Sequence, residues 1–338
     1  MARLSGLRHL RRAGRRTNLA LLVLVVGAFL TGWLSFAAAA RVPATLATVA
    51  HGLLGLGVVA LVPWKTVIIR RARLLWIASV LLVALIVVCL LAGFVEVFVG
   101  YPPSGRISPI QVHVAAALVA VPLLAWHVLR HRRQRLGRVD MSRRNLLRTG
   151  MFGLAIVAGY LGLEAVGRVF GLPSADRSAT GSHELPPEEA PATIWLLDRI
   201  PEVGADHRVD VAGTLLSPAE LRDRSVAVPA RLDCTSGWYT DAEWTAVSLA
   251  DLIPPAQRAA ATSIEVRSVT GYRRLFPADE SAKLWLATEV QGRSLQPAYG
   301  APVRLVAPGR RGFWWVKWVA SVRLTERPAE LQSPFPLQ

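Results

Sequence analysis

The first half of the sequence is dominated by long apolar segments that alternate with clusters of arginine. Four of them, near residues 18–40, 43–63, 74–99 and 110–129, can each cross the hydrocarbon core of a bilayer, which takes about 20 helical residues. A fifth, less apolar segment runs from about 149 to 171. Segments of this length are typical of lipid-embedded helices. We therefore predict an integral membrane protein with an all-α N-terminal bundle of about five transmembrane helices.

The distribution of charge predicts how these helices cross the membrane. Residues 1–173 carry 21 Lys and Arg against three acids, whereas the rest of the chain carries 18 against 20. The basic residues gather before the first segment, between the second and third, and between the fourth and fifth. Cytoplasmic connections are enriched in Lys and Arg, so we expect a cytoplasmic N-terminus and an extracytoplasmic C-terminal domain at the cell membrane. The pattern favours membrane lipid as a partner and argues against nucleic acid.

The texture of the sequence changes after the fifth segment. Residues 173–192 are rich in Pro, Ser and Gly, which is typical of a linker. Beyond them, short alternating runs predict strands at 207–212, 263–268, 303–306 and 316–324, with short helices near 215–222 and 248–252. The expected parts are a four-helix transmembrane domain (1–140), the fifth helix with the motif before it (141–172), the linker (173–192), and an α+β, mainly β, soluble domain (193–338).

Three histidines, His51, His113 and His127, lie inside the predicted membrane helices. Ionisable residues at such depth are costly and mark functional sites. His51 and His113 lie on antiparallel segments at similar depth near the outer side, so we predict that their neutral imidazoles bind one haem b iron. His127 lies 14 residues after His113 on nearly the same helix face and is the alternative axial ligand. Hydrogen bonding to neighbouring helices is the alternative for all three. Glycines that would let a flat macrocycle approach follow His51 at Gly52, Gly55 and Gly57.

The segment Ser142-Arg-Arg-Asn-Leu-Leu-Arg148 directly precedes the fifth apolar segment. It resembles the twin-arginine export motif, with Leu and Arg where Phe and Lys are commonest. That route carries domains that are already folded, often around a cofactor inserted in the cytoplasm. The resemblance therefore implies that the soluble domain contains a cofactor.

The soluble half contains one cysteine, Cys234, within Leu232-Asp-Cys-Thr-Ser-Gly-Trp-Tyr239. This segment resembles the molybdenum-ligand segment of the sulfite oxidase superfamily of molybdopterin enzymes, nearest to the periplasmic methionine-sulfoxide reductase catalytic subunits. Residues 286–309 and the later Val316-Lys-Trp318 are similar to the strands that wrap the pterin in that family. The similarity covers about residues 193–325. A soft thiolate suits molybdenum, and a small buried apolar residue is the alternative role for a free cysteine.

The resemblance implies that Cys234 is both the molybdenum ligand and the catalytic residue of a domain that binds the molybdenum cofactor. Arg304 and Lys317 are candidates for contacts with the pterin or its phosphate. Ser236 stands where the methionine-sulfoxide reductases carry an acid, so their substrate does not transfer directly. The residues that the resemblance implies around the pterin are Gly237, Trp238, Tyr272, Arg304, Gly312 and Lys317.

We therefore expect a membrane-bound molybdenum-dependent oxidoreductase. Quinol or another membrane electron carrier would supply electrons to the haem, and the molybdenum centre would reduce a small S-oxide or N-oxide. Two alternatives remain open from the sequence. Electrons could flow in reverse, from oxidation of a sulfite-like substrate to the haem, or the outer domain could be a cofactor-free binding or sensory module on a membrane anchor.

Overall fold

The structure of the protein is a computed structural model that describes residues 2–72, 77–102, 107–130, 142–192 and 199–336. Residues 131–141, which hold much of the predicted arginine-rich connection, and residues 193–198, the first six of the predicted soluble domain, lie outside the described residues. The chain divides into two compact units. The first comprises residues 1–36 and 41–183, and the second comprises residues 37–40 and 184–338.

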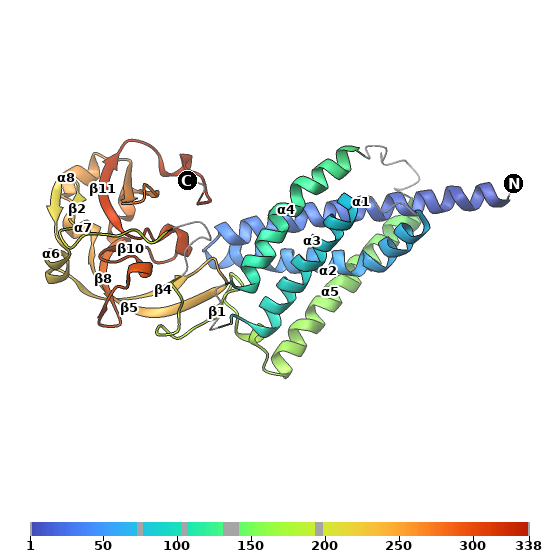
Figure 1. Ribbon diagram of the computed structural model, residues 1–338, viewed down its shortest axis with the longest axis horizontal. Helices are drawn as coiled ribbons and strands as arrows, with labels where there is room; N and C mark the ends of the chain where they lie inside the picture. The colour runs from blue at the N-terminus through green and yellow to red at the C-terminus, as the bar shows by residue number, and fades with distance from the viewer. Residues whose placement is uncertain (1, 73–76, 103–106, 131–141, 193–198, 337–338) are drawn as a thin grey trace. The chain divides into compact units, whose positions relative to one another are not determined.

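The first unit contains five long α-helices, drawn from blue to light green in Figure 1. They are α1 (Ala2–Ala37), α2 (Arg41–Ala72), α3 (Ile77–Val99), α4 (Pro109–Arg130) and α5 (Arg143–Val169). Within the described residues, each has a stretch long and apolar enough to cross a membrane. The predicted all-α bundle is therefore confirmed.

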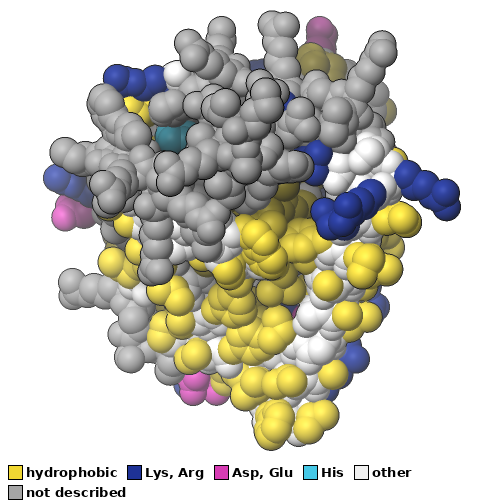
Figure 2. Space-filling view, turned by 90° about the vertical axis from the view of Figure 1, so that its right-hand side faces the viewer, with side chains coloured by type: hydrophobic (Ala, Val, Ile, Leu, Met, Phe, Trp, Pro, Cys, Tyr) yellow, Lys and Arg dark blue, Asp and Glu magenta, His cyan; other side chains and the backbone are white. Residues whose placement is uncertain are grey.

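Apolar side chains cover the outside of these helices. Leu91, Leu118 and Leu154, for example, are all exposed, and Figure 2 shows hydrophobic side chains gathered over a broad area of one face. Contiguous apolar surface of this extent is unfavourable in water and favourable in lipid. The helices therefore have the surface expected of a membrane domain.

Helix α5 begins six residues earlier than the sequence predicted. It starts at Arg143 after the N-cap residue Ser142, whose Oγ accepts a hydrogen bond from the side-chain amide of Asn145 at 2.7 Å. The Arg16 guanidinium on α1 also donates to Asn145 Oδ1, at 2.8 Å. The arginine motif is therefore the first turn of the helix, and the side chains of Arg143 and Arg144 are exposed.

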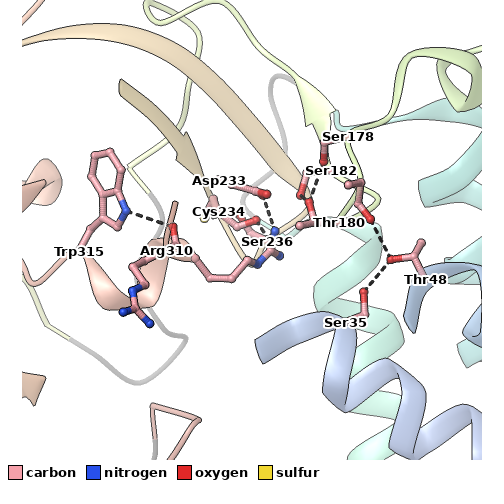
Figure 3. A network of polar contacts seen from close by, with 12 residues as sticks. Ser35, Thr48, Ser178, Thr180, Ser182, Asp233, Cys234, Ser236, Arg310 and Trp315 are labelled. Carbon is pink, nitrogen blue, oxygen red and sulfur yellow. Dashed lines mark hydrogen bonds and ion pairs between the residues drawn. The ribbon is translucent and has the colours of Figure 1, made fainter. Parts of the chain in front are cut away.

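The helices pack in pairs, with α3 against α4 and α2 against α5. A Cβ at Gly52 would lie 2.8 Å from the Tyr160 ring, and one at Gly57 would lie 3.2 Å from Ile156 Cδ1. These two glycines therefore admit side chains of α5, and only Gly55, where a Cβ would meet nothing within 4 Å, faces open space as a macrocycle would require. The first two helices are joined by the hydroxyls of Ser35 and Thr48, which lie 3.0 Å apart (Figure 3).

The second unit contains two β-sheets. One has the order β1-β5-β8-β10, with β4 paired to β5 and β9 paired to β8; the other has the order β3-β2-β11-β6-β7. In the second sheet β11 is parallel to β2, and the other pairs are antiparallel. The strands of the first sheet are β1 (His183–Glu184), β4 (Val226–Asp233), β5 (Trp238–Ser248), β8 (Trp285–Val290), β9 (Arg293–Ser294) and β10 (Arg304–Val306). Those of the second are β2 (Val209–Val211), β3 (Thr214–Leu216), β6 (Ser263–Ser268), β7 (Arg273–Pro277) and β11 (Val319–Thr325).

The unit is α+β and mainly β, as predicted, with differences in detail. The predicted helix 215–222 starts as strand β3, and helix α6 (Pro218–Asp223) begins only after Ser217. Ser217 Oγ accepts the Glu220 N–H, and the Glu220 carboxylate accepts the Ser217 N–H, so this capping box fixes where the helix begins. The predicted linker holds the 3₁₀-helix η2 (Pro173–Asp176) and strand β1. The remaining short helices are α7 (Leu249–Leu252), α8 (Pro255–Ala259), η3 (Ala278–Lys283), η4 (Pro297–Tyr299), η5 (Gly312–Trp314) and η6 (Ala329–Leu331).

Candidate active site

Cys234 begins the tight loop between β4 and β5. Asp233 pairs with Tyr239 as the last residues of the antiparallel ladder. The Cys234 N–H donates to the Trp238 carbonyl at 2.8 Å, and the Gly237 N–H donates to the Cys234 carbonyl at 3.4 Å. Gly237 has a φ of 99°, a backbone conformation that favours glycine. The loop that presents the cysteine is therefore closed by the Gly-Trp pair of the sequence motif.

The Cys234 thiol is half-buried and has a hydroxyl beside it. Its Sγ lies 3.1 Å from Oγ of Ser236 (Figure 3), and the Ser236 side chain is only 3% exposed. Ser236 therefore touches the candidate ligand atom.

Gly312 lies directly against the cysteine loop. A Cβ at this position would lie 3.2 Å from Cα of Cys234 and 3.1 Å from the Asp233 carbonyl oxygen. Its neighbour Arg311 is buried, forms an ion pair with the Asp233 carboxylate, and donates to the Cys234 carbonyl at 3.5 Å. The structure therefore brings Gly312 to Cys234, and the Asp233–Arg311 pair ties the two segments together.

Arg304, the first residue of β10, is a buried cation in an aromatic box. Its side chain is 2% exposed, and its guanidinium carbon lies 5.0, 5.8 and 5.7 Å from the ring centroids of Trp244, Tyr299 and Trp315. Among the described residues, its Nε has no hydrogen-bond partner. Burial lowers the pKa of Arg304 to about 10, and the nearby Tyr299 and Cys234 oppose that shift. A buried guanidinium is stable only with a partner, so this site is chemically suited to an anionic group beside the thiol.

Lys317 and Tyr299 meet at the 3₁₀ turn η4. The Lys317 ammonium donates to the Ala298 carbonyl at 2.7 Å, and the Tyr299 hydroxyl donates to the Ala190 carbonyl at 2.6 Å. Burial raises the pKa of Tyr299 to about 12, so the phenol is neutral at pH 7. Lys317 therefore contacts the backbone of η4 at Ala298. The next residue, Tyr299, is one of the three rings around Arg304.

Tyr272 lies in a second buried cation cluster. Its hydroxyl donates to the Phe313 carbonyl at 2.6 Å and accepts from Nε of Arg274 at 2.7 Å. Arg274 is completely buried, its Nη1 donates to the Ser333 carbonyl at 2.8 Å, and its Nη2 has no hydrogen-bond partner among the described residues. Burial raises the pKa of Tyr272. These bonds hold the segment that contains Gly312, so Tyr272 contacts the wall of the site through the backbone of Phe313.

Four residues of this region were not singled out from the sequence: Asp233, Arg274, Tyr299 and Arg311. Asp233 lies next to Cys234, and its position in the motif was a usable signal. Arg311 lies in Gly309-Arg-Arg-Gly312, where nothing in the sequence separates it from its neighbour Arg310, whose side chain pairs with Glu280 at 2.6 Å and whose carbonyl accepts from the Trp315 indole (Figure 3). Trp238, which was singled out, is 2% exposed and packs in the core.

In the first unit the structure brings His51 and His113 together. Their ring centroids lie 5.6 Å apart, with an interplanar angle of 77°. His51 Nδ1 bonds to the Ala28 carbonyl at 2.8 Å, and His113 Nδ1 bonds to the Cys89 carbonyl at 2.7 Å. His127 lies 14 residues further along α4, which is about 21 Å at 1.5 Å per residue. The pair formed by the two nearer histidines is therefore the one that can share a ligand.

Comparison with known proteins identifies the second unit. The family model of the oxidoreductase molybdopterin binding domain matches residues 199–332. The protein-methionine-sulfoxide reductase catalytic subunit MsrP of Xanthomonas campestris pv. campestris is 30% identical over 118 residues, which cover 30% of this chain and 37% of that protein. The NADPH nitrate reductase of Beauveria bassiana is 36% identical over 52 residues, 15% of this chain and 6% of that protein. The sulfane dehydrogenase SoxCD structure from Paracoccus pantotrophus aligns with a TM-score of 0.35 and 22% identity, over 39% of this chain and 41% of that one.

The chain spans well under half the length of these relatives. The matched region nevertheless defines a class: residues 199–332 form a molybdopterin-binding oxidoreductase domain. The second unit is therefore similar to molybdopterin-dependent oxidoreductases, as the motif around Cys234 predicted.

Proposed function

We propose that the protein is a membrane-bound molybdenum oxidoreductase that reduces a small S-oxide or N-oxide with electrons drawn from the quinone pool through a b-type haem. The observation that carries the proposal is Arg304, a buried cation with an orphaned Nε that interacts electrostatically with Cys234, inside a domain that matches the molybdopterin-binding model. The buried cation would bind an anionic part of the pterin, and the thiol of Cys234 would bind its metal.

The residues present fit the molybdenum cofactor. Cys234 would supply a third sulfur beside the two of the pterin dithiolene, and Arg304 would bind an anionic part of the cofactor. The missing side chain at Gly312 leaves room beside Cys234, and Gly237 sets the loop. Lys317 and Tyr272 would support the wall through the backbone of Ala298 and Phe313, and Trp238 would pack behind it in the core. When bound, the cofactor supplies the two-electron chemistry, while this chain's residues bind it and orient the substrate.

The substrate class rests on the relatives and on one difference from them. A matched relative is a protein-methionine-sulfoxide reductase subunit, which favours reduction of an oxygen bound to sulfur. Ser236 stands in place of an acid and is buried against Cys234. Without that negative charge beside the metal ligand, the site suits small neutral or anionic oxides, and we propose a small S-oxide or N-oxide.

The haem assignment rests on His51 and His113. The two rings lie with their centroids 5.6 Å apart, so His51 and His113 are the residues that would hold a haem iron between them. Each Nδ1 is bonded to a backbone carbonyl, which leaves Nε2 as the lone-pair nitrogen, the usual arrangement of a metal-binding histidine. The open space at Gly55 supports a bulky ligand here.

The orientation is part of the proposal. The arginine clusters favour a cytoplasmic N-terminus, so the molybdopterin-binding domain would be extracytoplasmic and the protein would contact lipid, quinol and a small-molecule substrate. The exposed Arg143 and Arg144 at the start of α5 are accessible to a twin-arginine export receptor. The proposed division is a four-helix haem domain up to residue 140, the export helix, and the molybdopterin-binding domain after the linker.

A metal analysis combined with a visible spectrum tests this function. The purified chain should contain molybdenum, and the reduced-minus-oxidised spectrum should contain a b-type haem band. Cys234→Ser should abolish oxide reduction and leave the haem band intact, whereas the matched variant Cys89→Ser should retain molybdenum. A wild-type protein with neither molybdenum nor haem would refute the proposal.

A further inference from the structure

The end of the bundle where α3 stops and α4 begins contains a buried acid that neither proposed cofactor site uses. Glu96 on α3 is 5% exposed. Its Oε2 accepts the N–H of Ile110, in the first turn of α4, at 3.2 Å. Its Oε1 is buried and has no hydrogen-bond partner among the described residues. An ionised carboxylate with an unpaired oxygen is costly at a membrane depth, so this oxygen needs a proton or a donor.

The surroundings of Glu96 are ordered and titratable. His183 is 6% exposed, and its Nε2 donates to the Glu96 carbonyl at 2.7 Å. Burial lowers the pKa of His183, so its ring is neutral at pH 7. The other acid of the described membrane helices, Glu164, is already paired with Arg177 at 2.7 Å. Glu96 therefore differs from Glu164 in having a free acceptor oxygen.

Glu96 also lies on the helix that supports the proposed haem ligand. It is seven residues, or about two helical turns, from Cys89, whose carbonyl accepts the His113 Nδ1 hydrogen bond. Three residues beyond Glu96, α3 ends at Val99, which is 71% exposed. A lipid-soluble molecule that approaches this helix end would be close to both the carboxyl and the electron acceptor.

From this placement we infer that Glu96 accepts the proton that a quinol hydroxyl releases when the quinol is oxidised at this end of the bundle. The inference rests on the proposed function and names a residue for its electron-input step. A quinol releases two electrons and two protons. Each proton leaves as an O–H bond of the quinol breaks and a carboxyl O–H bond forms on Glu96, which then releases it to water. His51 and His113 would hold the one-electron acceptor, a haem that would take the second electron after passing the first towards the molybdopterin-binding domain.

Glu96→Gln tests proton transfer and preserves the contact between α3 and α4. The amide oxygen still accepts the Ile110 N–H, but the side chain no longer takes a proton. The full chain in detergent is mixed with duroquinol, and the haem absorbance is followed. We expect an unchanged haem spectrum, unchanged reduction by dithionite, and reduction by duroquinol slowed about a hundredfold, the usual contribution of a general base. Glu164→Gln, the matched control, should keep the wild-type rate. A fluorescent quinolone N-oxide, as a quinol analogue, should bind Glu96→Gln as tightly as the wild type.

Three results would overturn the inference: a wild-type duroquinol rate in Glu96→Gln, loss of its haem band, or loss of quinolone N-oxide binding. The last two would make Glu96 a positioning or binding residue. A wild-type protein without a haem band would instead refute the proposed function, and the inference would fall with it.

Discussion

The imidazole rings of His51 and His113, 62 residues apart in the sequence, meet edge to face with their centroids 5.6 Å apart. Each ring is held by a carbonyl of a different helix, Ala28 on α1 for His51 and Cys89 on α3 for His113. The pair therefore depends on four helices at once: two that carry the rings and two that orient them. Such a junction orients both rings through hydrogen bonds, as the proposed haem ligands require.

On the proposed function, replacing either His51 or His113 should remove the haem. In His51→Ala and His113→Ala, the b-type band should disappear from the reduced-minus-oxidised spectrum, because one axial ligand alone does not complete the site. His127→Ala should keep the band, because His127 is about four turns away along α4. A spectrum lost in His127→Ala and kept in His113→Ala would reverse the assignment.

Replacing Arg304 should have opposite effects on stability and on cofactor retention. Arg304→Met removes a buried charge with an incomplete hydrogen-bond set, so the cofactor-free protein should be more stable, by about 1–4 kcal/mol. The same change should cost at least about tenfold in molybdenum retention, since a hydrogen bond to a charged group contributes about 1.5–3 kcal/mol. Thermal unfolding and metal analysis measure the two effects.

Arg231→Met is the control for that experiment. Arg231 is half-exposed and paired with Asp241 on the surface, so its loss should change stability by less than about 1 kcal/mol and leave molybdenum content unchanged. Equal molybdenum loss in both variants would show that Arg304 does not contact the cofactor.

A methyl group at position 312 should disturb the cysteine loop. In Gly312→Ala the new Cβ would approach the Cys234 backbone at 3.2 Å, so the two segments must shift, at a typical cost of about 1–3 kcal/mol. We expect a lower melting temperature and reduced molybdenum content. Gly153→Ala, where a Cβ meets nothing within 4 Å, should leave both quantities unchanged or raise the melting temperature. If the Gly312→Ala protein retains the molybdenum content of the wild type, the cysteine loop can shift without loss of the cofactor.

Tyr299 should make the protein less stable in alkali. Its folded pKa, about 12, is above the value near 10 of an unfolded tyrosine. The stabilisation is therefore complete below pH 10 and is lost as the pH rises from 10 to 12, by at most about 2–3 kcal/mol. Tyr299→Phe should be less stable at pH 8, by about 1 kcal/mol for the lost bond to Ala190, and should show a flatter decline above pH 10. Thermal unfolding at pH 8 and 11 measures this, and parallel declines would contradict it.

The membrane helices were predictable because one property, apolar length, decides them. The start of α5 was not, because the helix continues through Arg143–Arg148, where apolarity no longer marks it, and Ser142 and Asn145 decide its beginning. Strand β4 was missed for a related reason. It contains Pro229, which usually argues against a strand, but β4 pairs only with β5, and an edge strand tolerates proline.

The residues of the candidate site also fall into those that the sequence predicted and those that it did not. Cys234, Gly237 and Gly312 were predictable from the resemblance, and the structure brings these three together. The pairing of Asp233 with Arg311 joins residues 78 positions apart, and local sequence carries no signal for such a contact. Burial of Arg274 and Arg304 is equally a property of the folded sheets, since an arginine in an alternating strand is more often at the surface.

The bond from Arg16 to Asn145 has a consequence for the order in which the protein is made. Its donor belongs to α1 and its acceptor to α5, the last of the described membrane helices, 129 residues later. During synthesis the arginine must wait for the whole intervening chain before its partner exists. The contact can therefore form only after both α1 and α5 of the bundle have been synthesised. A fluorescence or crosslinking signal between these two positions would report, in a living cell, the moment at which assembly of the bundle is finished.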